Sequence, residues 1–204
     1  MEAPIFEKIY RDYLDRVSAM DLSGRGDLLG ISVSEEGIRI PFYGRPFTVT
    51  PHAITDSVGR KPHHAVSVIL CQYLLLCPEH SGEDRSLATF KDFRDAAPYV
   101  GGFRNTAELA IARQFSGRIE ALVERARALG AEPYETEVSC QLALRLPALP
   151  MVPIHLLFND ADEEFPADCT LLFERRAEHH LDMECLAMIG SILATWLGHR
   201  STPH

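Results

Sequence analysis

Residues 147–190 have the sequence PALPMVPIHLLFNDADEEFPADCTLLFERRAEHHLDMECLAMIG, and this segment decides the expected fold. Apolar side chains alternate at Ile154, Leu156 and Phe158, as they do in a strand with one buried face. The same alternation returns over 169–173 and predicts a second strand. The polar residues 159–168 between the two strands are too many for a two-residue hairpin, so we expect a surface loop there.

Proline limits where the first of these strands can lie. Pro153 has no N–H to donate to a strand ladder, and Pro147 and Pro150 precede it closely. We therefore expect the strand either to start after Pro153 or to run along an edge of its sheet at that point.

A buried helix is expected over 182–197. Asp182 is a good N-cap, Leu181 and Leu186 occupy the hydrophobic-staple positions, and Gly198 follows where a C-terminal glycine is common. Apolar side chains cover more than one stripe of this helix, so most of its surface should be buried.

Outside the central segment, the same arguments predict further helices and strands. The helices are expected from Pro4 to about residue 17, over 62–76, and over 105–129, where Asn105 and Glu108 form a capping-box-like start. The strands are expected over 28–33, 38–42, 47–50 and 138–146.

The resulting element order predicts an α+β protein. We expect an antiparallel sheet of about six strands, arranged as two β-meanders and packed against helices. A single domain over 1–204 is expected, because the 46% hydrophobic content suffices for one sizeable core. The order α-β-β-β-α occurs twice and suggests two similar halves, 1–80 and 103–198. The alternative is that two helix-flanked meanders occur together by chance.

Charge and cysteine content exclude several classes of protein. The net charge of -9 argues against a nucleic-acid-binding protein or a protein bound to an anionic membrane, because both need clustered Lys and Arg. The start of the chain lacks the basic and apolar regions of a secretory signal, and no apolar run reaches the length of a membrane helix, so we expect a cytoplasmic protein. The five cysteines form no C-x-x-C pair, which favours reduced thiols.

The first candidate site is the sequence Gly101-Gly102-Phe103-Arg104-Asn105 at the start of the long helix. Free N–H groups at a helix N-terminus bind anions, and glycine gives a ligand access to the backbone. Arg104, with Arg94 nearby in sequence, would add positive charge. Gly101, Gly102, Arg104 and Asn105 therefore form a candidate site for a phosphate or carboxylate. The alternative is an ordinary helix start.

The second candidate site is a metal-binding site. The acidic loop 160–164 contains Asp160, Asp162, Glu163 and Glu164, whose oxygens suit a divalent cation, and His155 precedes it on the expected strand. His180 would face Glu184 if the last helix began earlier than Asp182. The candidate metal ligands are His155, Asp162, Glu163 and His180. The alternatives are a solvated loop and a polar helix entrance.

The central segment also resembles the C-terminal signature of a prokaryotic family, domain of unknown function 3786. That signature has an acidic loop ending in Phe-Pro, a strand ending in Leu-Phe, and a helix start containing Leu and Glu. The matching residues are Asp162, Glu163, Glu164, Phe165 and Pro166, then Leu172 and Phe173, then Leu181, Glu184 and Leu186. The sequence departs from it at Ala161, Glu174, His180 and Cys185.

The resemblance implies a fold but no activity. Some similar proteins carry an additional cysteine-rich iron–sulfur segment that is missing here, so the resemblance also implies a redox or cofactor context and a protein partner within it. The chain has no P-loop, G-x-S-x-G or H-E-x-x-H motif, so no cofactor is identified from the sequence.

Three functions follow from these features. The first is a cytoplasmic, non-catalytic or accessory domain that binds a small anion or cofactor between the sheet and residues 101–105. The second is a metal-dependent enzyme that uses the acidic loop. The third is a structural or protein-interaction subunit. The sequence does not decide whether the protein is an enzyme, and we expect no nucleic-acid or membrane partner.

Overall fold

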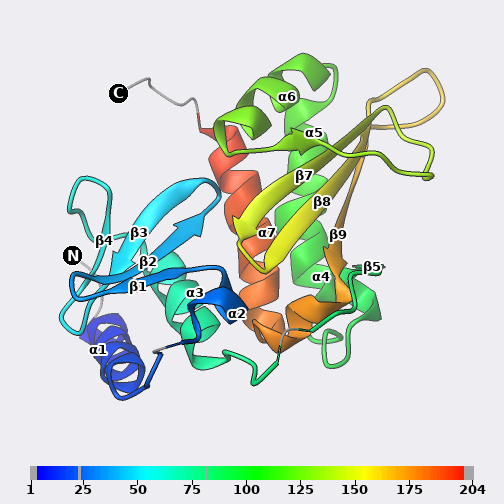
Figure 1. Cartoon of the computed structure of the whole chain (residues 1–204). Helices are drawn as coiled ribbons and strands as arrows, with labels where there is room; N and C mark the ends of the chain where they lie inside the picture. Colours follow the sequence, from blue (N-terminus) through cyan, green and yellow to red (C-terminus); the bar gives the residue numbers. More distant parts are fainter. Residues whose placement is uncertain (1–3, 23, 81, 200–204) are drawn as a thin grey trace.

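The computed structural model describes residues 4–22, 24–80 and 82–199, and it confirms the α+β class (Figure 1). In this part of the chain, the strands form two antiparallel sheets of four and five strands in place of the single sheet of about six that we expected. Residues 1–3 and 200–204 of the expected 1–204 domain lie outside the described residues.

The first sheet is a meander enclosed by helices. Helices α1 (Pro4–Ser18) and α2 (Gly26–Leu29) precede it, and α3 (His64–Leu75) follows it. Its strands are β1 (Ser32–Ser34), β2 (Gly37–Phe42), β3 (Arg45–Val49) and β4 (Ile54–Asp56), which pair in sequence order. The expected strand over 28–33 is wrong in its first half, because α2 occupies it and Gly30 ends that helix in the left-handed conformation with a φ of 62°.

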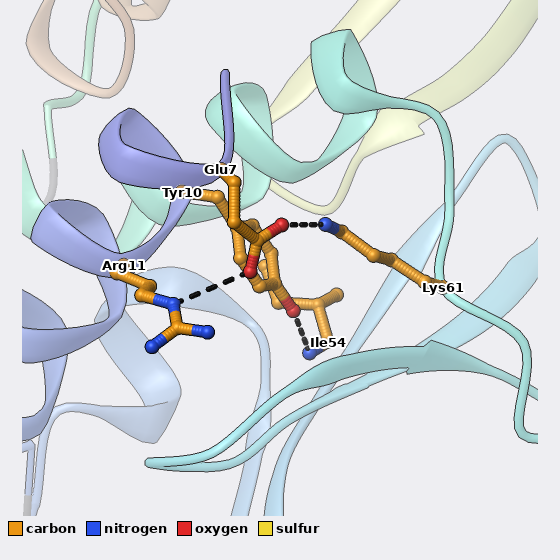
Figure 2. A network of polar contacts seen from close by, with 5 residues as sticks. All are labelled: Glu7, Tyr10, Arg11, Ile54 and Lys61. Atoms are coloured by element: carbon orange, nitrogen blue, oxygen red, sulfur yellow. Dashed lines mark hydrogen bonds and ion pairs between the residues drawn. The ribbon is translucent and has the colours of Figure 1, made fainter. Parts of the chain in front are cut away.

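Helix α1 is fastened to the first sheet by polar contacts (Figure 2). Lys61 Nζ donates to Glu7 Oε2 at 2.8 Å, and Arg11 Nε donates to Glu7 Oε1 at 3.3 Å. The backbone N–H of Ile54 donates to the Tyr10 hydroxyl at 2.7 Å, which joins α1 to the start of β4. The bonds from Lys61 and Arg11 lower the pKa of Glu7, and the Lys61 bond contributes most.

The second sheet has the strand order β5-β9-β8-β7-β6. Its strands are β5 (Leu87–Thr89), β6 (Glu132–Pro133), β7 (Leu142–Leu149), β8 (Val152–Asn159) and β9 (Asp168–Glu174). Strands β6 to β9 form the second meander, and β5 adds to its edge beside β9. The structural similarity of the two halves, residues 1–80 and 103–198, stays a prediction.

Helices lie on one face of the second sheet (Figure 1). They are α4 (Val100–Phe103), α5 (Leu109–Phe115), α6 (Ile119–Ala128) and α7 (Met183–Gly198). A π-helical turn, Arg104–Glu108, joins α4 to α5, and short 3-10 turns occur at Phe90–Asp92 and Arg175–His179.

Helix α7 runs between the two sheets (Figure 1) and occupies the centre of the core. Asp182 caps it as expected, because its carboxylate accepts from the Cys185 N–H at 2.8 Å. Leu181 and Leu186 at its start are fully buried, which confirms the mostly buried helix expected from the sequence. Apolar side chains of both sheets belong to one continuous cluster around it.

The turn between β2 and β3 joins the first sheet to the second. Tyr43 and Gly44 both have positive φ, 47° and 71°, as in the tight turns that match strand twist. The Tyr43 hydroxyl, fully buried, donates to the Ile189 carbonyl of α7 at 2.7 Å, and its backbone N–H donates to the Ala148 carbonyl of β7 at 3.1 Å.

Strand β8 is a central strand that includes Pro153, so the expected start after this proline is wrong, but at Pro153 itself β8 has no pairing with β9, in agreement with the alternative of a local edge. The ladder between β7 and β8 is irregular between Leu146 and Leu149, and the pairing of β8 with β9 begins only at Ile154. Pro153 therefore lies at a bulge, where a residue without an N–H is tolerated.

The strand expected over 138–146 is displaced, since β7 starts at Leu142. The Gln141 N–H donates to the Asn159 side-chain oxygen at 3.1 Å and to the Phe158 carbonyl at 3.2 Å. A side-chain acceptor therefore shares this N–H with the backbone at the point where the regular strand ladder ends.

The single helix expected over 105–129 is also wrong. Helical structure starts five residues earlier, at Val100, and breaks at 116–118, where Gly117 has a φ of 71°. The early start is favoured by Phe103, which is buried and stacks on Phe90 with ring centroids 4.4 Å apart. Asn105 and Glu108 consequently lie inside the helical segment and not at its beginning.

Two glycine substitutions test this packing. A Cβ on Gly190 would lie 2.5 Å from Phe103 Cε2, so Gly190→Ala should destabilise the protein by about 1–3 kcal/mol through overpacking. A Cβ on Gly102 would meet nothing within 4 Å, and Gly102→Ala should stabilise the helix by up to about 1 kcal/mol. Urea unfolding of both variants measures the difference, and equal effects would contradict the close approach of α7 to α4.

Candidate functional site

A small cavity lies between the helical segment after Val100 and the edge of the second sheet. Its volume is about 180 Å³. Its polar lining comes from three separate segments, the turn after β5, the π turn and strand β9, and its apolar wall comes from rings and a valine. The lining residues are Thr89, Phe90, Lys91, Val100, Phe103, Arg104, Glu108 and Thr170.

The π turn places two charged residues on this cavity. Arg104 begins the turn and Glu108 ends it, and both side chains line the cavity. A π turn holds one residue more than an α-helical turn, and such turns are rare and frequent at functional sites. The turn is held against α7, because the Thr106 and Ser191 hydroxyls are 2.7 Å apart and share a hydrogen bond.

Lys91 approaches the cavity from the 3-10 turn Phe90–Asp92. This turn is closed by Asp92, whose Oδ2 accepts from the Thr89 hydroxyl at 2.5 Å and from the Thr89 N–H at 3.2 Å. Phe90 next to Lys91 is buried against Phe103 and Phe173. The backbone that carries Lys91 is therefore fixed relative to the helix that carries Arg104.

Glu108 sits between these cations and the sheet. Its Oε1 accepts from the Leu171 N–H at 3.1 Å. Burial raises the pKa of Glu108, while the Leu171 bond, Arg104 and Lys91 oppose the rise and Asp168 adds to it. The cavity thus combines two positive side chains with one carboxyl group that takes up a proton more readily than usual.

Of the four residues expected to bind an anion, Arg104 alone lines this cavity. Gly101 and Gly102 lie in the first turn of the helical segment, where backbone N–H groups have no intrahelical acceptor, and their side-chain positions face open space. Asn105 is exposed in the π turn. No sequence motif predicts Lys91 or Thr170 at this cavity, and the capping box expected at Asn105 and Glu108 hides the role of Glu108 in its lining.

The structure does not bring the four candidate metal ligands together. Asp162 and Glu163 are exposed on the loop after β8, and Figure 1 places that loop at the opposite end of the β8–β9 hairpin from the start of α7, which His180 precedes. Within residues 4–22, 24–80 and 82–199, no group of three or more His, Cys, Asp or Glu has the arrangement of a metal site.

The acidic loop is shaped by its own hydrogen bonds. Asp162 Oδ1 accepts from the N–H groups of Glu164 and Phe165 at 2.8 and 2.7 Å, which lowers the pKa of Asp162. Asp160 Oδ1 accepts from the Gly117 N–H at 2.6 Å and ties the loop to the break between α5 and α6. These two carboxylates therefore serve as local acceptors in a surface loop.

His155 and His180 are buried, and neither ring nitrogen of either residue has a hydrogen-bond partner within the described protein. His155 packs against the Tyr134 ring at 4.4 Å, and His180 lies 5.9 Å from the Tyr73 ring. Burial lowers the pKa of both, to about 4 for His180, where Arg176 adds to the effect. Both rings are consequently neutral at pH 7.

The thiols are all free, as expected for reduced cysteines. Cys185 in the first turn of α7 is buried, and its pKa is raised by burial and by Asp182. The pKa values of Cys71 and Cys169 are raised by burial as well. These three thiols are poor nucleophiles.

The fold and the cavity define an α+β protein with paired cationic side chains at one sheet edge. The chain belongs to the family described as a domain of unknown function, DUF3786, which matches residues 21–196. This confirms the resemblance seen in the acidic loop and the strand and helix after it. Comparisons with curated proteins and with solved structures each found no match. In the described residues, no helix is both long and apolar enough to cross a membrane.

The buried His180 predicts a loss of stability in acid. Its pKa is about 4 in the folded protein against 6.5 ordinarily, so between these values the unfolded chain binds more protons and the free energy of unfolding falls as pH falls. By pH 4.5 the loss should reach about 2–3 kcal/mol, and above about pH 7 it should be negligible.

Urea unfolding at neutral pH and at about pH 4.5 measures this loss. His180→Leu should unfold with a smaller difference between the two conditions than the native protein. The exposed His52 provides the matched control, because His52→Gln should keep the native difference. The same difference in His180→Leu as in the native protein would show that this ring does not cause the acid sensitivity.

Proposed function

We propose that this protein is an accessory binding domain that holds a small oxyanion, a phosphate or carboxylate group, in the cavity between Lys91 and Arg104. The observation that carries the proposal is the convergence of these two cations on one small cavity in a chain of net charge -9. Guanidinium and ammonium groups are the side chains that bind oxyanions most strongly.

The dimensions and surroundings of the cavity support a small ligand. Its volume of about 180 Å³ is below that of the sites that hold drug-sized molecules. The Thr170 side chain on β9 adds a hydroxyl to the lining, and Phe90 and Phe103 form an apolar wall that strengthens electrostatic attraction.

Anion titrations test the proposal. Inorganic phosphate, sulfate and short dicarboxylates should bind the native protein in calorimetric titrations. Lys91→Ala and Arg104→Ala should each weaken binding about 10-fold or more, because a hydrogen bond to a charged group contributes about 1.5–3 kcal/mol. The matched control is Arg94→Ala, since Arg94 is exposed and lines a different cavity near the start of α7.

Three results would contradict this site. They are an absence of binding to native protein, equal affinities in native protein and Arg104→Ala, and a loss in Arg94→Ala as large as in Arg104→Ala. Thermal unfolding of each variant shows whether its fold is kept.

Glu108 gives the binding a pH dependence. Ionised Glu108 repels an anion, whereas protonated Glu108 can donate a hydrogen bond to it. Because the pKa of Glu108 is raised above its usual 4.5, the affinity should increase as pH falls through that raised value. Glu108→Gln keeps a side-chain oxygen for the Leu171 N–H and removes the charge.

We expect Glu108→Gln to bind phosphate up to about 10-fold more tightly at neutral pH than the native protein, with a flatter pH profile. Calorimetric titrations from mildly acidic to neutral pH give both profiles, and the ionisation of phosphate itself is corrected for by repeating them with sulfate. Parallel profiles in the two proteins would exclude Glu108 from the site.

A further inference from the structure

A second, larger cavity lies where the β2–β3 turn, the loop before α3 and the end of α7 meet. Its volume is about 530 Å³, within the range of sites for small organic ligands. The side chains that give it chemical character are Arg45, Arg60, His63, Val66 and Trp196. It shares no lining residue with the Lys91–Arg104 cavity.

The cavity has a rigid aromatic wall. Trp196 is the single tryptophan of the chain. Its ring packs edge-on against two buried rings of the first sheet, Phe42 at 5.5 Å and Tyr43 at 5.8 Å between centroids. Because these rings belong to the core, the orientation of the indole is fixed before any ligand binds.

Arg45 lies over the indole face. Its guanidinium carbon is 4.4 Å from the centroid of the Trp196 ring, the distance of a cation–π contact. A planar guanidinium stacks on aromatic rings and also pairs with anions, so Arg45 is suited to a ligand that carries both. The Arg45 side chain is exposed, which leaves its other face accessible.

The charge of the lining favours an anion. The lining contains two cationic side chains, Arg45 and Arg60, and one carboxylate, that of Asp56. Asp56 Oδ1 already accepts from the N–H groups of Arg60 at 2.8 Å and Val58 at 3.0 Å, which lowers the pKa of Asp56. Across the described residues, neither Arg45 nor Arg60 belongs to a salt bridge.

The N-terminus of α3 adds to this potential. The helix has 12 residues, and its N-cap His63 and first-turn residue Val66 both line the cavity. The positive end of the helix dipole therefore points toward the same space as the two guanidinium groups.

We propose that this cavity binds a planar aromatic anion. The ring lies against Arg45 and the Trp196 wall, and the anionic group lies toward Arg60 and the start of α3. A neutral aromatic ligand would leave the two arginines without an anionic partner, and an anion without a ring would leave the apolar wall exposed to water. The ligand class is therefore defined by a ring and a negative charge in the same molecule. The proposal is independent of the oxyanion cavity.

Trp196 reports directly on this binding, because all tryptophan fluorescence of the protein comes from it. Phenyl phosphate is the probe, and phenol and inorganic phosphate are its matched controls. We expect a saturable change in Trp196 fluorescence with phenyl phosphate, at concentrations about 10-fold lower than any change with either control. No saturable change with phenyl phosphate, or an equal response to inorganic phosphate, would overturn the proposal.

Arginine variants locate the ligand. Arg60→Ala should weaken phenyl phosphate binding about 10-fold, and Arg45→Lys, which keeps the charge but loses the planar group, should also weaken it. The matched control is Arg39→Ala on β2, whose side chain is 67% exposed and pairs with Glu36 outside the cavity. Native affinity in Arg60→Ala and Arg45→Lys would overturn the proposal.

Two further measurements separate fold and site. Thermal unfolding checks that the variants remain folded, and calorimetry of Trp196→Phe shows whether binding persists when the reporter is removed. Arg104→Ala should leave the fluorescence titration unchanged, so the two cavities are tested separately. A loss of the fluorescence response in Arg104→Ala with the fold intact would overturn the assignment to this cavity.

Discussion

The docking of the Tyr43 turn is the contact on which the rest of the arrangement depends. Tyr43 reaches α7 through its hydroxyl and β7 through its backbone N–H, so one residue joins the first sheet to both main elements of the second half. A non-glycine residue with positive φ is strained by about 1–2 kcal/mol, and the two buried hydrogen bonds offset this cost. The same turn carries Phe42 and Arg45 to Trp196, so the second cavity exists only when the sheets are joined.

Much of the fold follows from local chemistry in the sequence. The cap at Asp182, the broad apolar surface of α7 and the alternation of β9 are each determined by neighbouring residues, and all three were predicted. The single buried face expected for β8 is wrong, because residues 152–158 are buried on both faces. The errors come from tertiary effects. Pro153 is accepted in a central strand because a bulge removes the need for its N–H. The helix starts at Val100 because Phe103 packs against Phe90 and Gly190, and neither of these two residues is near Phe103 in the sequence.

The candidate sites show the same division. Arg104 was found because it lies close to glycines at a helix start, which is a local signal. Lys91 and Thr170 join it only after the chain folds, and the side chain of Glu108 was assigned to a cap because the helix start was misplaced. The histidines illustrate the opposite error. His155 and His180 have ligand chemistry, but the apolar residues beside them in sequence already indicate burial, and both are neutral rings within the core.

The π turn Arg104–Glu108 also limits which one-residue deletions a homologue can tolerate. It holds one residue more than the regular helix on either side of it, and each residue of an α-helix turns the chain by about 100°. A homologue with a single deletion inside this turn would regain a regular helix, but all the side chains on one side of the deletion would rotate away from their present neighbours. Either the apolar face of α5 or the shared position of Arg104 and Glu108 on the cavity would be lost. An alignment gap of one residue here would therefore separate relatives that keep this cavity from those that do not.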